Sequence, residues 1–283
     1  MLGLGRNRLP SRTPEQLAAM RVAGLLTGRT LAMLEAELTP GMTTLDLDRL
    51  AEAFIRDHGG IPNFQLVDGY EHTLCTSVNE QIVHGIPSSS VVLREGDLLS
   101  IDCGAEVDGW NGDSAVTLFV GGRAAARPED VLLSDATEAS MWAGIAAMRV
   151  GGRLNDIGAA IEDSIVEAGR RDGHEYGIVQ DYVGHGIGES MHLEPQVFNY
   201  RIRQRGPALP VGATLAIEPM ITWGNQANHV LADEWTVVTD DRQRASHWEH
   251  SVATTEGGVT VLTAIDGGVE RLSALGVPVV SLD

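Results

Sequence analysis

Apolar residues recur at helical spacing near the start of the chain. Thr13, Pro14 and Gln16 predict where this helix begins, with Thr13 as N-cap, proline in the first turn and Gln16 closing a capping box. The apolar stripe that follows consists of Leu17, Met20, Ala23, Leu31 and Leu34. The Thr-Pro-Gly sequence at 39–41 ends the pattern, because proline and glycine do not continue a helix.

A second helix is predicted from about Thr44 to His58, and its surroundings have a counterpart later in the chain. Residues 40–59 align with residues 150–169 at a constant offset (150 − 40 = 110). The matched positions include Gly41 with Gly151, Asp46 with Asp156, Ile55 with Ile165 and Gly59 with Gly169. Helices that end in glycine can match by chance, but predicted helices precede both copies and predicted strands follow both. We therefore expect a duplicated helix-plus-strand unit that forms two lobes.

Strand patterns follow both helical regions. In the first half they cover residues 72–78, 97–106 and 114–121, and Asp108-Gly109 marks a turn between the last two. In the second half they cover residues 213–223, 234–240, 246–255 and 259–264. We predict an α+β fold in which a short extension (1–12) precedes a single domain (13–283), with helices packed over an antiparallel sheet.

Carboxylates interrupt these apolar strands. Asp102 lies between Ile101 and Cys103, and Asp113 begins the returning strand at an odd separation (113 − 102 = 11). Across a hairpin with a two-residue turn, an odd separation points both side chains to one face, about 4.5–8 Å apart. Two carboxylates that close repel each other unless a cation lies between them.

The second half repeats the anomaly with Glu218 in AIEPM and Glu249 in HWEHSV. Any one of the four acids could be a solvent-facing residue of an edge strand, but together with His185 in the glycine-rich stretch VGHGIG they favour a metal site. Four carboxylates neutralise two divalent cations. Oxygen ligands with one imidazole suit Mn, Fe, Co or Zn, and two such ions make a hydrolytic centre.

Composition and charge narrow the class of protein. The 283 residues are 43% apolar and 21% charged, and the net charge is strongly negative (20 − 39 = −19). This charge argues against a nucleic-acid groove or an anionic membrane surface as partner. Cys75 and Cys103 are too few for a disulfide framework. No apolar run approaches a membrane span and no signal peptide is evident, so we expect a cytoplasmic protein.

Five motifs together resemble those of methionine aminopeptidases of the short bacterial type, which are pita-bread metallopeptidases. They are SVNEQIVHGIP (77–87), SIDCGAEVDGWNGD (100–113), GHGIGESMHLEPQV (184–197), AIEPM (216–220) and HWEHSV (247–252). The resemblance extends over nearly the whole chain and implies the pita-bread fold, with pseudo-twofold lobes on a curved antiparallel sheet. It implies that the metal ligands are Asp102, Asp113, His185, Glu218 and Glu249.

The same resemblance implies a mechanism and a partner. A hydroxide that bridges two metal ions attacks the first carbonyl of a peptide with a free N-terminus, and Glu218 accepts and returns the proton. His192 stabilises the carbonyl oxygen and His84 contacts the peptide nitrogen; by itself His84 would be interpreted as a turn residue. The implied substrate is the N-terminal methionine of nascent proteins, which suggests transient proximity to ribosomes. A monomer is the expected state.

The pocket for the methionine side chain is expected to contain Phe64, Tyr70, Cys75, Met191 and Trp235, although ordinary core packing would also explain them. The chain departs from the family at three positions. Met191 replaces a usual aromatic residue, Val67 a frequent tyrosine and Asn111 a common histidine. A pocket lined by methionine could accept other unbranched side chains, so strict selectivity is less certain than peptidase activity.

Two other functions fit parts of the sequence. Xaa-Pro aminopeptidases and dipeptidases share the metal ligands but usually carry a sizeable extra N-terminal domain, whereas about a dozen residues precede the first helix here. A non-catalytic peptide-binding relative would be expected to lose ligands, and this chain keeps all five together with His84 and His192.

Overall fold

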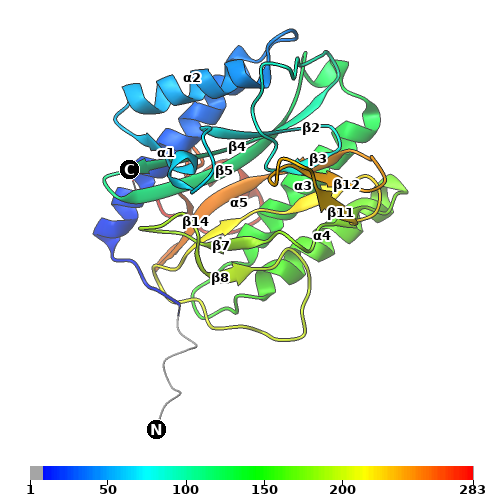
Figure 1. Cartoon of the computed structure of the whole chain (residues 1–283). Helices are drawn as coiled ribbons and strands as arrows, with labels where there is room; N and C mark the ends of the chain where they lie inside the picture. The colour runs from blue at the N-terminus through cyan, green and yellow to red at the C-terminus, as the bar shows by residue number, and fades with distance from the viewer. Residues whose placement is uncertain (1–8, 283) are drawn as a thin grey trace.

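The computed structural model describes residues 9–282 of the chain, so most of the predicted extension lies outside the described residues. The α-helices are α1 (Pro14–Glu37), α2 (Thr44–Asp57), α3 (Pro128–Ala147), α4 (Asp156–Asp172) and α5 (Val269–Ala274). Two short 3₁₀ helices are η1 (Asn63–Leu66) and η2 (Arg123–Ala125). In Figure 1, α1 and α2 lie toward the upper left and α3 and α4 toward the right, with the long strands between them.

The strands of the first half are β1 (Ile61–Pro62), β2 (Leu74–Val78), β3 (Gln81–Val83), β4 (Leu98–Val107) and β5 (Trp110–Phe119). Those of the second half are β6 (Gly177–Ile178), β7 (Gly184–Gly186), β8 (Leu193–Val197), β9 (Thr214–Ile217), β10 (Met220–Thr222), β11 (Asn228–Val230), β12 (Val237–Thr239), β13 (Ala245–His247), β14 (Glu249–Thr255) and β15 (Gly258–Val261). The largest sheet has the order β1-β4-β5-β14-β9-β7-β8, with β2 also on β4 and β15 also on β14. Strand β14 therefore joins the two halves, because β5 pairs with it on one side and β9 on the other.

Helix α1 begins where the sequence predicts. The Thr13 hydroxyl accepts a hydrogen bond from the Gln16 N–H (3.3 Å), and the Gln16 side chain accepts one from the Thr13 N–H (2.9 Å). By length and mean hydropathy, α1 is the one helix among the described residues that could cross a membrane. However, 61% of its most apolar window is buried within the protein, as in the core helix of a soluble protein. One such helix is weak evidence for a membrane span.

The duplication predicted from the offset of 110 residues is visible where the second helix of each half begins. The Asp46 carboxylate accepts a hydrogen bond from the Thr43 N–H (2.8 Å), and the Asp156 carboxylate accepts one from the Arg153 N–H (3.1 Å). Thr43 and Arg153 also each form an isolated antiparallel bridge to a later segment. The match fails at Gly169, which lies inside α4; that helix ends instead at Gly173, which has φ +68°.

Each half has its own apolar core. In the first, Leu34 and Ile55 of α1 and α2 pack with Ile101 of β4. In the second, Ile145 of α3 and Ile161 of α4 pack into a cluster that includes residues of β9 and β14. The two helix pairs thus cover separate parts of one large sheet, whose remaining face is free to carry the polar residues described below. The α+β fold with helices over an antiparallel sheet is confirmed.

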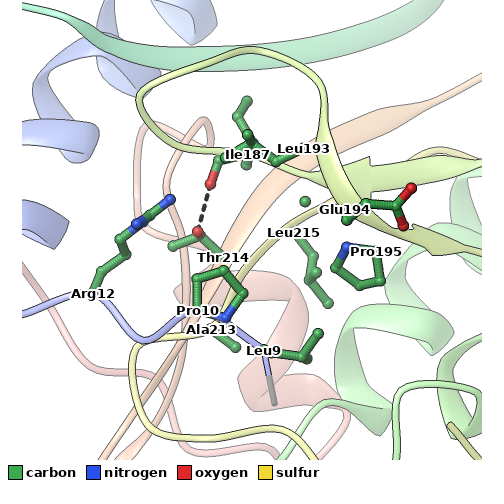
Figure 2. Close-up of a pocket in the computed structure, with 11 residues that line it drawn as sticks. Leu9, Pro10, Arg12, Ile187, Leu193, Glu194, Pro195, Ala213, Thr214 and Leu215 are labelled. Atoms are coloured by element: carbon green, nitrogen blue, oxygen red, sulfur yellow. Dashed lines mark hydrogen bonds between the residues drawn. The ribbon is translucent and has the colours of Figure 1, made fainter. Parts of the chain in front are cut away.

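The described part of the extension lies along the second half of the sheet. The Arg12 N–H donates to the Gly212 carbonyl (2.8 Å), and the Ser11 hydroxyl donates to the Val211 carbonyl (2.5 Å). Figure 2 shows Leu9 and Pro10 beside the segment that carries Thr214 and Leu215, with the Arg12 side chain directed toward the loop that follows Ile187. The segment before α1 is therefore attached to the strands that carry part of the candidate site.

Candidate metal centre and active site

Neighbouring strands of the large sheet each supply one of the five predicted metal ligands. Asp102 is on β4, Asp113 on β5, Glu249 at the start of β14, Glu218 just after β9 and His185 on β7. These strands are consecutive in the sheet. The predicted ligands are far apart in sequence, and they meet because the strand order places them side by side.

The hairpin places Asp102 and Asp113 on one face, as their odd separation predicts. Its two-residue turn is at Asp108-Gly109, and the register pairs Asp102 with Ala115 and Gly104 with Asp113. Ala115 also pairs with Glu249 across β5 and β14. Residues paired directly across strands point to the same face, so Asp102 and Glu249 flank Ala115 on the face that Asp113 shares.

Strand breaks accompany the two glutamates, contrary to the predicted continuous strands. The 213–223 region divides into β9 and β10 at Glu218-Pro219, and the 246–255 region divides into β13 and β14 at Trp248. Pro219 has no N–H to donate to a ladder, which explains the first break. Both breaks turn the chain where a carboxylate enters the site.

His185 reaches the site from a short strand, β7, for which the glycine-rich stretch gave no strand prediction. A register shift between His185 and Gly186 interrupts the pairing of β7 with β8. The glycines allow close packing of strands. A Cβ on Gly184 would lie 2.3 Å from the Ala216 carbonyl oxygen, and one on Gly186 would lie 2.5 Å from that of Glu194. Neither glycine has a positive φ.

The structure brings all five predicted ligands close enough to share metal ions. Three overlapping groups contain them, and within each group the candidate ligand atoms lie within 4.8 Å of one another: Asp113, His185 and His192; His185, Glu218 and Glu249; Asp102, Asp113 and Glu249. The His185 Nε2 lies 3.8 Å from Asp113 Oδ2 and 3.5 Å from Glu218 Oε1.

Buried like charges make this cluster costly without cations. Burial raises the pKa of Asp102 to about 7. Burial and neighbouring carboxylates raise the pKa values of Asp113, Glu218 and Glu249 well above the usual range. Asp102 Oδ1, Asp113 Oδ1 and Glu249 Oε1 are buried without a hydrogen-bond partner among residues 9–282. A divalent cation would satisfy these oxygens and offset the repulsion, so the residues fit a metal centre.

The protonation of His185 suits a ligand. Burial lowers its pKa to about 4, with His192 as a second cause, so the ring is neutral at pH 7. Its Nδ1 lies 2.9 Å from the Gly186 carbonyl oxygen, which only accepts hydrogen bonds. The proton therefore lies on Nδ1, and the Nε2 lone pair faces the carboxylates.

His192 and His84 lie beside the carboxylates. The ring of His192 is 4.5 Å from that of His185, centre to centre, and has an edge-to-face orientation. His84 has φ +60°, an uncommon conformation for a residue other than glycine. Burial lowers the pKa values of both, that of His84 to about 4, so each can carry one N–H donor while uncharged.

Two cavities meet at the cluster. One of about 190 Å³ contains all the residues predicted for the methionine pocket: Phe64, Tyr70, Cys75, Met191 and Trp235. Phe64, Tyr70, Cys75 and Met191 also form a small apolar cluster of their own. The other cavity, of about 430 Å³, extends past Tyr182 and Gln196. Both cavities are lined by His84, Asp102, His185, His192 and Glu218.

Sequence analysis missed His247 and Tyr182. His247 lines the larger cavity and is 2% exposed. It lies two residues before Glu249 in the quoted HWEHSV motif, so its position in the motif was the available indication. Tyr182 contacts His84 edge to face, with ring centres 5.5 Å apart, and nothing in its local sequence marks it.

The departure at Asn111 lies outside the apolar cavity. The Asn111 backbone N–H and side-chain amide both donate to the Gly188 carbonyl, at 3.0 Å and 3.1 Å. Asn63 donates to the Asn111 side-chain oxygen (3.3 Å). Asn111 thus attaches β5 to the loop that leads to Met191 and His192.

Comparisons with known proteins agree with this geometry. The family model of metallopeptidase family M24 matches residues 18–256. The chain is 48% identical over 259 residues to methionine aminopeptidase 1 of Mycobacterium tuberculosis. The aligned region is 92% of this chain and 96% of that relative. The solved structure of methionine aminopeptidase from Thermotoga maritima matches with a TM-score of 0.85 and 34% identity, over 91% of this chain and all of that one (100%).

More distant structures share only the fold. Prolidase from Pyrococcus furiosus matches with a TM-score of 0.65 and 20% identity, over 89% of this chain but 65% of that one. The pita-bread fold implied by the five motifs is confirmed. The strand order, the cluster of carboxylates and the similarity over nearly the full length lead to one assignment: this chain belongs to metallopeptidase family M24, among its bacterial methionine aminopeptidases.

Proposed function

We propose that this protein hydrolyses the first peptide bond of chains that begin with methionine. The observation that carries the proposal is that the carboxylate cluster and an apolar cavity of about 190 Å³ share a wall formed by Asp102, His185 and Glu218. A side chain held in the cavity would place its own carbonyl beside the carboxylates. The named relatives from Mycobacterium tuberculosis and Thermotoga maritima, both methionine aminopeptidases, support this choice of substrate.

Asp102, Asp113, His185, Glu218 and Glu249 would hold two divalent ions, drawn from Mn, Fe, Co and Zn. Such ions supply a water of lowered pKa and polarise a carbonyl. The protein contributes the fixed positions of the ligands on a rigid sheet. Four carboxylates of this set balance the four positive charges of two such ions.

Glu218 would transfer the proton during hydrolysis. Its carboxyl lines both cavities, so it lies beside the position of the scissile bond in either of them. From there it would take up a proton from the attacking water and later return that proton to the departing amine.

His192 and His84 would orient the peptide. Both are neutral donors on the wall shared by the cavities. We assign His192 to the carbonyl oxygen, where a donor stabilises the charge that develops during attack, and His84 to the nitrogen of the scissile bond. The free N-terminus would be selected because the carboxylates of the cluster favour an amine over a blocked end.

Side-chain selectivity would come from Tyr70, Trp235 and Met191. The rings of Tyr70 and Trp235 pack with centres 4.9 Å apart and form a firm wall. Met191 gives another part of the pocket a flexible wall, so activity on other unbranched side chains is a second possibility.

We further propose a monomer that acts in the cytoplasm on nascent chains near ribosomes, without binding nucleic acid, in keeping with its net charge of −19.

The test uses purified protein stripped with chelator and supplied with Mn²⁺ or Co²⁺. We expect release of the first residue from Met-Ala-Ser, much less from Leu-Ala-Ser, and none from Ala-Pro-Ser. His192→Ala should lower kcat by about 100-fold. His229→Ala is the matched control, because His229 is an exposed residue bound to Asp240 outside both cavities. Cleavage of Ala-Pro-Ser in preference to Met-Ala-Ser would contradict the proposal and favour a proline-directed peptidase.

A further inference from the structure

Glu218 lies between two imidazoles, one at each carboxylate oxygen. Its Oε1 is 3.5 Å from the His185 Nε2, on the side of the predicted metal ligands. Its Oε2 is 3.7 Å from the His247 Nε2, on the side of the larger cavity. The two oxygens of the Glu218 carboxylate therefore have different neighbours, and the neighbour of Oε2 is His247.

The His247 side chain is buried, and its polar atom there lacks a partner. The residue is 2% exposed, and Nε2 has no hydrogen-bond partner among the described residues. A neutral imidazole carries a single N–H, which either ring nitrogen can hold. A buried polar atom without a partner destabilises a protein, which indicates that Nε2 has a hydrogen-bond partner in the working site.

The backbone of His247 is fixed from several directions. Its N–H lies 3.1 Å from the Thr117 hydroxyl, and that hydroxyl donates to the His247 carbonyl at 2.8 Å. The Ser100 hydroxyl lies 3.3 Å from the same N–H. His247 also pairs with Met220 across β13 and β10, two residues beyond Glu218. The same pair of strands thus sets the relative position of the ring and the carboxylate.

We propose that His247 is a positioning residue for Glu218: its Nε2–H donates a hydrogen bond to Oε2 and leaves Oε1 directed toward the metal ligands. A decrease of about 0.7 Å from the observed separation brings the two atoms to an ordinary hydrogen-bond distance. The inference rests on the proposed role of Glu218 as ligand and proton acceptor. A carboxylate oriented in this way binds cations more tightly, because its geometry is set before the ion arrives.

The test compares His247→Leu, which has no donor, with His247→Gln, which retains an N–H donor. Mn²⁺ affinity is measured by calorimetry on metal-free protein, and kcat and KM are measured on Met-Ala-Ser at saturating Mn²⁺. We expect His247→Leu to weaken Mn²⁺ binding and lower kcat by about 10–100-fold each with little change in KM, while His247→Gln stays near wild type. Thermal unfolding of each variant verifies that it is folded.

His174→Leu is the matched control, because His174 is a half-buried histidine stacked on Trp223 (ring centres 3.8 Å apart) away from both cavities. Equal defects in His247→Gln and His247→Leu would contradict the proposal, as would unchanged Mn²⁺ affinity and kcat in His247→Leu. An increase in KM alone would instead make His247 a substrate contact. If wild-type protein releases no methionine, the proposed function fails, whereas the Mn²⁺ affinities still decide the role of His247.

Discussion

Met191 illustrates how a single side chain can set the breadth of this site. It is 9% exposed and packs with Phe64, Tyr70 and Cys75 in the apolar cavity. Methionine is unbranched and flexible, so it adapts to the shape of its neighbours where a ring would hold a fixed outline. His192, the next residue, lies beside the carboxylate cluster. The same short loop therefore carries both a residue of the side-chain pocket and a polar residue of the metal site.

Shortening Met191 should relax side-chain selection. Met191→Ala widens the cavity and removes contacts with the substrate, so we expect KM for Met-Ala-Ser to rise about 10-fold, with a smaller change in kcat. The preference for Met-Ala-Ser over Leu-Ala-Ser should also fall. Met42→Ala, in the first-half core, controls for the general effect of losing a methionine side chain. An unchanged ratio of kcat/KM values for the two peptides would exclude Met191 as a selective residue.

The sequence indicated a site residue where a charged side chain interrupts an apolar strand. Asp102 and Asp113 stand out as charges in apolar strands, and the parity of a hairpin fixes their common face. His247 gives no such conflict, since one histidine near the end of a strand is ordinary. Its significance depends on its distance to Glu218, which only the folding of distant strands establishes.

At the scale of secondary structure, the segment before α1 acts together with β5 to hold the loop that carries His192. The Arg12 guanidinium lies 2.7 Å from the Glu189 carboxylate and 5.7 Å from the centre of the Trp110 ring. A Cβ on Gly188 would lie 2.3 Å from Arg12 Nη2, so a larger residue there would displace the guanidinium. Asn111 binds the same loop from the other direction.

Removing the Arg12 side chain should loosen this loop without affecting metal binding. The ion pair is partly exposed on the Glu189 side, which limits its contribution to about 1 kcal/mol. For Arg12→Ala we expect KM for Met-Ala-Ser to rise by about fivefold and amide hydrogen exchange over residues 188–192 to accelerate. Mn²⁺ affinity should be unchanged. Arg201→Ala is the control, since Arg201 pairs with the exposed Asp163. Amide exchange over residues 188–192 that is faster in Arg201→Ala but unchanged in Arg12→Ala would refute this role.

Elements were predictable where local interactions decide them. The capping box at Thr13 and Gln16 fixes the start of α1 within a few residues of sequence. The break at Glu218-Pro219 and the short strand at His185 were not predicted, because they depend on neighbouring strands. Gly184 is required by the approach of the Ala216 carbonyl, which belongs to a strand distant in sequence.

At the scale of the whole molecule, the buried carboxylates couple metal content to stability. Without metal, Asp102, Asp113, Glu218 and Glu249 have raised pKa values and are more protonated in the folded chain than in the unfolded chain. Unfolding therefore releases protons, and stability decreases by about 1.4 kcal/mol per pH unit for each proton released, until pH exceeds the folded pKa values. Histidines with lowered pKa values act oppositely, but only below about pH 6.5.

Metal-free protein should therefore lose thermal stability between pH 6.5 and pH 8, and added Mn²⁺ should largely abolish this loss. The measurement is the unfolding temperature after treatment with chelator, at several pH values, with and without Mn²⁺. The metal-loaded protein should also unfold at a higher temperature, because the ion binds only the folded site. A metal-free unfolding temperature that rises over this pH range would show that the carboxylates do not control stability.

The position of β14 also bears on how the enzyme is made. Strands β4 and β5 leave the ribosome before β9, yet β14, which lies between β5 and β9 in the sheet, is synthesised after all three. Until β14 inserts, β5 has an open edge and the site lacks Glu249. A growing copy therefore has no complete site, and the enzyme becomes competent only after the chain has been translated through β14.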